Sequence, residues 1–205
     1  MKAVLQRVFD ASVTVLGNER GRIRFGLLAY LGVALNDTEA DADWLAEKTV
    51  NLRVFDDDDG KMNRSIRDIV ADNTLLPAEI KDKPPVNHVN GMVNNVVVNG
   101  GFGQVNRNHV NHDFEMVNSG SINHNTPDIG VLAVSQFTLL GDARKGRRPS
   151  WGRAAPPETA RRLYEYFAEK IRALGVACEC GEFQAHMQVH YTNDGPVTIL
   201  LDSRE

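Results

Sequence analysis

The chain has 205 residues, a formal net charge of −4, 42% hydrophobic residues and 24% charged residues. This composition is typical of a globular protein with one core, and the slight acidity excludes binding of nucleic acid through overall charge. No stretch approaches the roughly 20 apolar residues of a membrane-spanning helix, and residues 1–7 lack the apolar run of a signal peptide. We therefore expect a cytoplasmic protein with no membrane partner.

The first third of the chain predicts strands followed by a helix. Polar and apolar side chains alternate along the early segments, and a continuous apolar run then indicates a central strand. A capping box at Thr38–Asp41 opens a helix that we expect to end near Val54. The expected strands are residues 2–8, 12–16, 20–25 and 26–34.

Residues 55–63 contain four consecutive aspartates and a glycine, which together suggest a calcium loop. Aligning Gly60 with the glycine of such a loop puts Phe55 at the first ligand position and Ile66 at the last. Neither side chain can bind calcium, so we interpret the segment as a solvated turn.

The composition changes between residues 70 and 129. Val-Asn occurs seven times there, four of the six histidines lie there, and no helical or strand period persists. We predict a disordered, low-complexity insertion. A histidine-rich metal tract, an interaction arm and a short β-solenoid are the alternatives, although the spacing matches no recognised ligand pattern or fixed repeat.

Residues 131–140 predict a buried strand whose only polar side chains are Ser135, Gln136 and Thr138. Polar groups inside a core strand are costly unless they find partners, and a strongly basic loop follows them directly. A polar-bearing strand before a cationic loop suits a site that holds a polyanion near reactive groups. The clustered basic residues are Arg144, Lys145, Arg147, Arg148 and Arg153.

The last quarter of the chain predicts one helix and three closing strands. The helix begins at Pro156-Pro157-Glu158 and ends at Gly175. We expect the strands at residues 176–180, 183–191 and 197–201. The fold class is therefore α+β, with mostly antiparallel strands in a barrel-like core and two main helices.

Ser135 and Thr138 are the candidate nucleophiles on the predicted strand, and His186 and His190 are the only histidines outside the insertion. The spacing of these residues does not specify a catalytic triad. Hydroxyl groups that bond to nearby backbone are the simpler interpretation.

Cys178 and Cys180 raise the question of a metal site. If their strand lies beside that of His186 and His190, the four side chains could act as zinc ligands. Cys-x-Cys is not the usual zinc spacing, so ordinary strand packing is the favoured interpretation. We expect no metal and no cofactor.

Asn193-Asp194-Gly195-Pro196 is a turn sequence by composition. Only about 5–6% of X-Pro bonds are cis, so the residues by themselves favour a trans hairpin turn.

Several of these motifs, in this order, resemble the D-aminoacyl-tRNA deacylase family of the bacterial D-tyrosyl-tRNA deacylase type. The resemblance predicts one deacylase domain over residues 1–205, with a core at 1–69 and 130–205 interrupted by the insertion at 70–129. The matching segments are Met1–Val8, Phe55–Ser65, Ser135–Leu139, Gly141–Ser150 and Asn193–Thr198.

The resemblance implies a homodimer that hydrolyses the ester bond of D-aminoacyl-tRNA and of mischarged glycyl-tRNA. It implies that Gly195 and Pro196 form a cis bond, enter the partner's pocket and exclude L-amino acids. It also implies that the 2′-hydroxyl of the RNA assists a water molecule, while backbone N–H groups of Phe137 and Thr138 stabilise the oxyanion.

The resemblance places Ser135 and Gln136 in the same site and assigns tRNA phosphate contacts to the cationic loop. Met187 and Gln184 form a pocket wall. The family has Gly where Gln184 stands, and often Asp where His186 stands, so Gln184 is expected to narrow or reshape the pocket. The phosphate contacts are Arg144, Lys145, Arg147 and Arg148.

Two other functions remain open from the sequence. The first is a non-catalytic relative that binds nucleic acid through the same fold and basic loop. The second is a deacylase that is regulated by its insertion.

Overall fold

The structure is a computed structural model that describes residues 1–72, 129–144 and 146–205. It confirms the α+β class. The elements are β1 (Lys2–Val15), β2 (Asn18–Gly32), α1 (Glu39–Asn51), β3 (Phe55–Asp56), β4 (Met62–Arg64), α2 (Ile66–Ala71), β5 (Ile129–Ser135), the 3₁₀ helix η2 (Phe137–Leu140), α4 (Pro157–Ala173), β6 (Cys178–Cys180) and β7 (Gln188–Asp202).

Five strands form one mixed sheet in the order β6-β5-β2-β1-β7. β1 pairs antiparallel with β2 and β7, whereas β5 pairs parallel with β2 and β6. Parallel neighbours need a crossover connection, and α4 supplies it between β5 and β6. The antiparallel pairing that we expected therefore holds on the β7 side of the sheet, while the β6 side is parallel.

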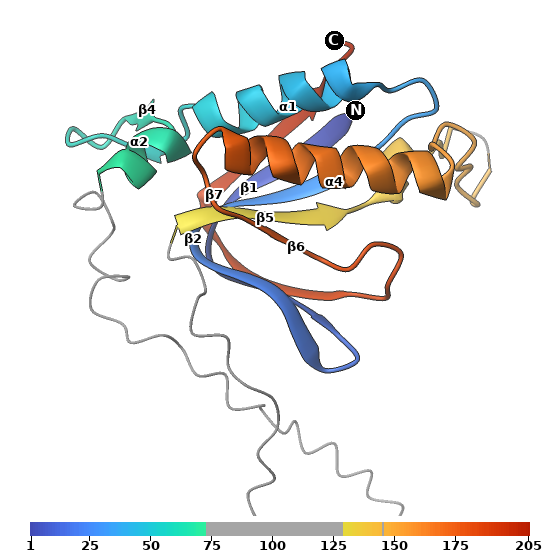
Figure 1. Cartoon of the computed structure of the whole chain (residues 1–205), viewed down its shortest axis with the longest axis horizontal. Coiled ribbons are helices and arrows are strands. Elements are labelled where there is room, and N and C mark those ends of the chain that lie inside the picture. The colour runs from blue at the N-terminus through green and yellow to red at the C-terminus, as the bar shows by residue number, and fades with distance from the viewer. Residues whose placement is uncertain (73–128, 145) are drawn as a thin grey trace, which may run out of the picture.

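Helices α1 and α4 lie side by side over one face of the sheet (Figure 1). Their apolar faces and the inner face of the sheet form one core, so β5 is buried along most of its length. On α4, the core-facing residues Leu163, Phe167 and Ile171 are fully buried.

Four strand predictions need correction. The expected strands at 20–25 and 26–34 are one strand, β2. The expected strands at 2–8 and 12–16 are one strand, β1, which continues through an irregularity between Phe9 and Ser12. β5 ends at Ser135, because the chain then turns into η2 rather than continuing to Leu140. The expected strands at 183–191 and 197–201 also differ, since β7 runs unbroken from Gln188 to Asp202 and residues 183–187 precede it.

The aspartate-rich segment forms the β3–β4 hairpin. The Asp57 carboxylate accepts hydrogen bonds from the backbone N–H groups of Asp59 and Lys61, both at 3.0 Å. A carboxylate that satisfies the backbone of its own turn agrees with the turn interpretation.

The predicted insertion at 70–129 lies almost wholly outside the described residues. At its edges, Val70 and Ala71 belong to α2 and Ile129 belongs to β5. Among the helices of the described part, none is long and apolar enough to cross a membrane.

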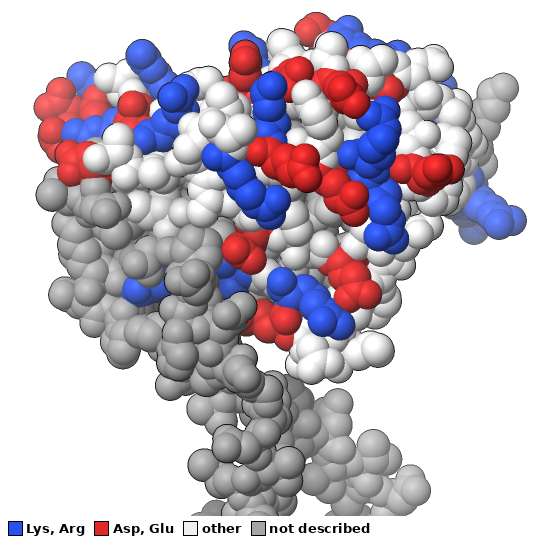
Figure 2. All heavy atoms as spheres, in the orientation of Figure 1, with Lys and Arg blue, Asp and Glu red and all other residues white. Residues whose placement is uncertain are grey.

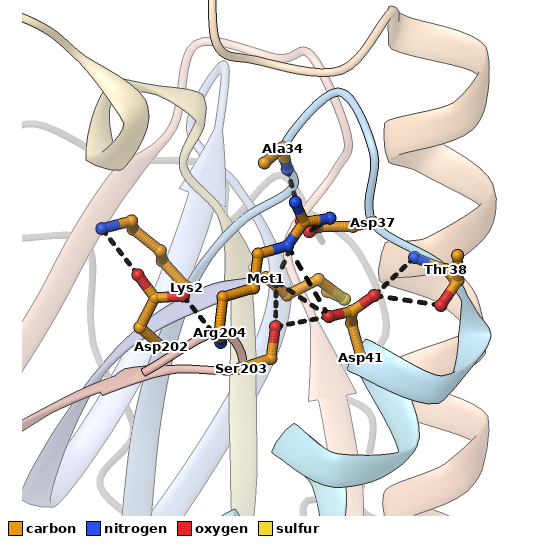
Figure 3. A network of polar contacts seen from close by, with 9 residues as sticks. All are labelled: Met1, Lys2, Ala34, Asp37, Thr38, Asp41, Asp202, Ser203 and Arg204. Carbon is orange, nitrogen blue, oxygen red and sulfur yellow. Dashed lines mark hydrogen bonds and ion pairs between the residues drawn. The ribbon is translucent and has the colours of Figure 1, made fainter.

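A polar cluster joins the start of β1 and the end of β7 to the loop before α1 (Figure 3). The Met1 ammonium lies 2.9 Å from the Asp37 carboxylate, and both side chains are fully buried. Arg204 reaches the same carboxylate at 2.9 Å, and the Ser203 hydroxyl donates to Asp41 at 2.7 Å. The cluster thus fixes two neighbouring strands and the first turn of α1 to one another.

Candidate active site

A cavity of about 630 Å³ lies where β5 ends, between β2, the start of α4 and residues 183–187. Its wall is mostly apolar, as is usual for a small-molecule pocket. It brings together five of the predicted site residues, although they come from segments that are far apart in the chain. These residues are Ser135, Gln136, Phe137, Gln184 and Met187.

The turn after β5 gives this end of the cavity its shape. The Gln136 N–H donates to the Leu31 carbonyl at 2.7 Å, which holds the chain to β2 before it enters η2. The first N–H groups of a helix lack intrahelical acceptors. Those of Phe137 and Thr138 have no acceptor among the described residues, so both remain available as donors.

Thr138 does not line the cavity, unlike Gln136 and Phe137. Its side chain is exposed, and its hydroxyl accepts a hydrogen bond from the Gln136 amide. Within the described part of the chain, no hydrogen bond joins Ser135 or Thr138 to a histidine. No activated serine or threonine nucleophile is therefore assembled here.

The basic loop follows directly after η2. Paired backbone hydrogen bonds of 2.9 and 2.8 Å between Asp142 and Ser150 close it. Arg144 pairs with Asp142, and its hydrogen bonds hold the pKa of that carboxyl well below the usual range. Arg147 and Arg148 are exposed, and Lys145 lies outside the described residues.

Elsewhere on the visible surface the charges are mixed. Figure 2 shows acidic and basic side chains interspersed over the helical face, without a broad patch of one sign. Attraction of a polyanion therefore depends on local basic groups rather than on the whole surface.

Trp151 is a residue that the sequence analysis missed. Its ring meets that of Phe137 edge to face, with centroids 5.3 Å apart, although 57% of Phe137 and 40% of Trp151 remain exposed. Exposed aromatic rings beside arginines are typical of sites that stack nucleic-acid bases. In the sequence, the only signal for Trp151 was its position directly after the basic residues of the loop.

Gly195 and Pro196 lie in a wide bulge of β7. Gln6 of β1 pairs with Thr198 and Val8 pairs with Asn193, so four β7 residues lie opposite one β1 residue. The Gly195-Pro196 bond is cis, as the resemblance implied, and the alternative of a trans hairpin turn is wrong. Both residues are exposed, and neither lines the cavity of its own chain.

Arg7 is the β1 residue opposite this bulge, and it is a second residue that the sequence analysis missed. Its side chain is only 8% exposed. Its Nε atom lies 2.6 Å from the Asp194 carboxylate, and its Nη1 atom donates to the Val54 carbonyl at 2.7 Å. A buried guanidinium with fixed partners holds the bulge against the body of the fold.

Two tyrosines also face the cavity. The Tyr164 hydroxyl donates to the Ala133 carbonyl at 2.8 Å, which fixes α4 to β5. Burial raises the pKa of Tyr164, and burial together with Tyr191 raises that of Tyr30. Both phenols therefore stay neutral at physiological pH.

Gln184 adopts φ +65°, a left-handed conformation that favours glycine. The Gln184 side chain lies at the cavity wall, where the resemblance led us to expect glycine. His186 also lines the cavity and is exposed.

The zinc hypothesis finds no support in the described part of the chain, where no group of three or more potential ligands forms a metal site. Cys178 is buried in the core, and Cys180 packs against it.

Comparison with known proteins agrees with the motifs. The family model described as D-Tyr-tRNA(Tyr) deacylase matches residues 4–77 and 105–202. The D-aminoacyl-tRNA deacylase of Thermotoga petrophila is 41% identical, over 99% of this chain and 97% of that protein. The protein of the same name from Syntrophobacter fumaroxidans is 42% identical, over 100% and 99%.

Solved structures show the same fold. The "c-Myc DNA Unwinding Element Binding Protein" is 32% identical with a TM-score of 0.65, over 98% of both chains. A "probable eukaryotic D-amino acid tRNA deacylase" has a TM-score of 0.62 at 12% identity, over 98% of this chain and 97% of that one. The chain belongs to the D-Tyr-tRNA(Tyr) deacylase family.

Proposed function

We propose that the protein hydrolyses the ester bond of D-aminoacyl-tRNA, and of mischarged glycyl-tRNA, and so releases the free amino acid and tRNA in the cytoplasm. One observation carries the proposal. The cavity collects Ser135, Gln136, Phe137, Gln184 and Met187, and the ring of Phe137 contacts that of Trp151, which follows the exposed Arg147 and Arg148 in the chain. An amino acid fits such a cavity, and the 3′ end of an RNA suits its rim.

The chemistry uses water and the RNA itself. With the 2′-hydroxyl of the terminal adenosine assisting, water adds to the ester carbonyl, and the bond to the ribose oxygen breaks. The backbone N–H groups of Phe137 and Thr138 stabilise the negative charge that forms on the carbonyl oxygen. The absence of a Ser135–His or Thr138–His hydrogen bond among the described residues supports this assignment.

The RNA is held at the rim. Arg144, Lys145, Arg147 and Arg148 neutralise phosphates, which gives an affinity that depends on salt but not on sequence. Phe137 and Trp151 present exposed rings on which a terminal base stacks.

Selection against L-amino acids comes from a second copy of the chain. Gly195 and Pro196 project from β7 without reaching the cavity of their own chain, so only a partner's bulge can complete the pocket. β7 is an edge strand, and Leu200 on it is 76% exposed, which suits a dimer interface.

Hydrolysis of D- and L-aminoacyl-tRNA by the purified protein tests the function. We expect turnover of the D-ester at least about a hundredfold faster than that of the L-ester, because a steric clash in a closed pocket costs several kcal/mol. Equal rates for both esters would contradict the chirality assignment.

Thr138→Ala tests the chemistry, with Ser135→Ala as its matched partner. We expect each variant to retain activity within about tenfold of the wild type, because neither hydroxyl attacks the ester. A loss of three or more orders of magnitude, about 4 kcal/mol in the barrier, would identify a protein nucleophile instead.

Nucleic-acid binding without turnover is the second candidate, and the name of the 32% identical DNA-unwinding-element-binding protein favours it. In that case the protein would bind tRNA in a salt-dependent manner and leave both esters intact.

We also propose that residues 73–128 are an insertion in a single deacylase domain. Replacing them with a short Gly/Ser linker tests this. We expect an unchanged deacylation rate, since extra chain length between α2 and β5 adds little closure entropy. Lost activity in a folded protein would make the segment part of the function.

A further inference from the structure

A second cluster of reactive side chains lies at the β6 edge of the sheet, apart from the candidate active site. Cys178 and Cys180 are two residues apart on one strand and therefore share a face. Cys178 is 3% exposed. Cys180 is half-buried and lines a separate cavity of about 240 Å³ against α4.

Arg172, in the last turn of α4, brings a positive charge to this cluster. Its Nη2 and Nε atoms donate to the Cys178 carbonyl at 2.6 and 3.0 Å, which fixes the guanidinium in place. The same Nη2 atom lies 3.6 Å from the Cys180 sulfur. A cation held against a partly exposed thiol is the usual environment of a reactive cysteine.

The thiols differ in their ionisation. A hydrogen bond from the Cys178 side chain and the charge of Arg172 outweigh burial and lower the pKa of Cys180 to about 7. The same interaction and burial raise the pKa of Cys178. The pair thus consists of a half-buried thiol with a lowered pKa and a buried thiol with a raised pKa.

We propose that Cys180 and Cys178 form a peroxide-sensitive redox pair whose oxidation to a disulfide alters the wall of the candidate active site. The Cys180 thiolate attacks one oxygen of hydrogen peroxide, the O–O bond breaks, and hydroxide leaves and takes up a proton. The Cys178 sulfur then attacks the Cys180 sulfenic acid, the S–S bond forms and water leaves. Two thiols are oxidised, and one peroxide is reduced to two water molecules.

The strand must shorten for the second step. Cα atoms two residues apart in a strand are separated by about 6.6 Å, near the upper end of the roughly 4.4–6.8 Å that disulfides span. β6 ends at Cys180, so the shift falls on Gly181. The Gly181 N–H donates to Ala133 at 2.8 Å, and its carbonyl accepts from Tyr164 at 3.3 Å.

These contacts connect Gly181 to the larger cavity, that of the candidate active site. Tyr164 and Phe183 line both cavities, and residues 183–187 form a wall of the larger one. A displacement of Gly181 therefore reaches the pocket, and we expect the disulfide form to deacylate at least about fivefold more slowly. This effect on activity rests on the proposed deacylase function, whereas the redox chemistry does not.

Mass spectrometry of the whole chain after treatment with hydrogen peroxide tests the chemistry. We expect the wild type to lose two hydrogens, with Cys178 and Cys180 joined in one peptide and thiols restored by dithiothreitol. Cys178→Ser keeps a hydrogen-bond donor but removes the second thiol, so it should stop at a sulfenic acid that dimedone traps. Cys180→Ser should leave Cys178 reduced.

The pH dependence of alkylation by iodoacetamide tests the role of the neighbours without relying on activity. In Cys178→Ser, Cys180 should react with a midpoint near its pKa of about 7. Cys178→Ala, which lacks the donor, and Arg172→Gln, which lacks the charge, should both shift the midpoint upward. An unshifted midpoint in both would overturn the assignment of the thiolate.

Other outcomes overturn the proposal directly. A wild-type protein that retains both thiols, or forms only disulfides between chains, would refute the redox pair. An intrachain disulfide with unchanged deacylation would refute its coupling to the pocket. A reduced protein without deacylase activity would contradict the proposed function but leave the mass measurements decisive for the redox pair.

Discussion

The two edge strands of the sheet, β6 and β7, differ in how much unpaired backbone they expose. β6 is three residues long, begins at the buried Cys178 and lies against α4, so it presents little free edge. β7 is fifteen residues long, and Tyr191 and Leu200 on it are 37% and 76% exposed. A short, covered edge resists pairing with other chains, whereas a long, open one invites it. The comparison associates β6 with control within the chain and β7 with assembly between chains.

Arg7→Ala should produce the largest effect on the β7 side. It leaves Asp194 without its buried partner, so we expect the free energy of unfolding to fall by about 3 kcal/mol. Release of the bulge should also slow deacylation by about a hundredfold, because Gly195 and Pro196 lose their fixed position. Urea unfolding and single-turnover deacylation provide the two measurements.

Lys2→Ala is the matched control for Arg7, since Lys2 pairs with Asp202 at 2.8 Å between the same two strands but is partly exposed. We expect a loss below about 1 kcal/mol and unchanged turnover. Equal effects of the two variants would mean that Arg7 does not position the bulge.

Leu200→Asp tests whether the open edge is an interface. Placing a charge on an apolar contact should weaken dimerisation at least about tenfold, as measured by sedimentation, and lower activity in parallel. Leu16→Asp is the control, because Leu16 is 93% exposed at the turn between β1 and β2. A dimer that survives Leu200→Asp would move the interface elsewhere.

Gln184→Gly tests the segment that follows β6. Because Gln184 has φ +65°, glycine should relieve strain and raise the free energy of unfolding by about 1 kcal/mol, or Tm by about 2–4 °C. The wider pocket should also favour bulky D-amino acids. Gln188→Gly, within β7, should instead lose about 0.5–1 kcal/mol. A gain in both would exclude the conformational explanation.

Asp41→Asn should have the smallest effect, at the end where β7 meets β1, and this effect should disappear in acid. Burial acts to raise the pKa of Asp41. Hydrogen bonds from Ser203 and Thr38, together with the Met1 ammonium, outweigh burial and lower the pKa to about 2. A carboxyl with a depressed pKa stabilises the fold above its ordinary value of 3.8, and this contribution disappears as the pH falls through about 2.

The variant should therefore be less stable than the wild type at pH 7, and the two should converge near pH 2. Urea unfolding at the two pH values measures this. Asp58→Asn is the control, because the Asp58 side chain is 89% exposed. A difference between wild type and Asp41→Asn that is the same at both pH values would contradict the role of the carboxylate.

Local patterns were enough to predict the two long helices and the regions of the long strands, but not α2 or η2. Alternation and caps act within a few residues, and they located α1 and α4 closely, whereas β2 was expected as two strands. The parallel pairing of β5 with β2 depends on contacts between distant segments, which no local pattern contains. The β7 prediction failed for a related reason, since turn residues can form a bulge on an edge strand instead of ending it.

The candidate site likewise contains residues that a local motif predicts and residues that only distant contacts explain. Ser135, Gln136 and Phe137 were predicted because they form one contiguous motif, and the structure places them on one cavity wall. Arg7 was missed because a lone arginine in an alternating strand predicts a solvent-exposed side chain. Its burial depends on Asp194, from the other end of the chain.

The pairing of β1 with β7 has a consequence for how the molecule is made. β1 leaves the ribosome well before its partner strand, since paired residues such as Lys2 and Asp202 lie far apart in the sequence. The bulge with Gly195 and Pro196 and the anchor at Arg7 meet only when these segments come together. Such non-local closure is slow, and it leaves one edge of β1 unpaired during synthesis. Until β7 has paired with β1, the folding chain therefore lacks the bulge that Arg7 anchors.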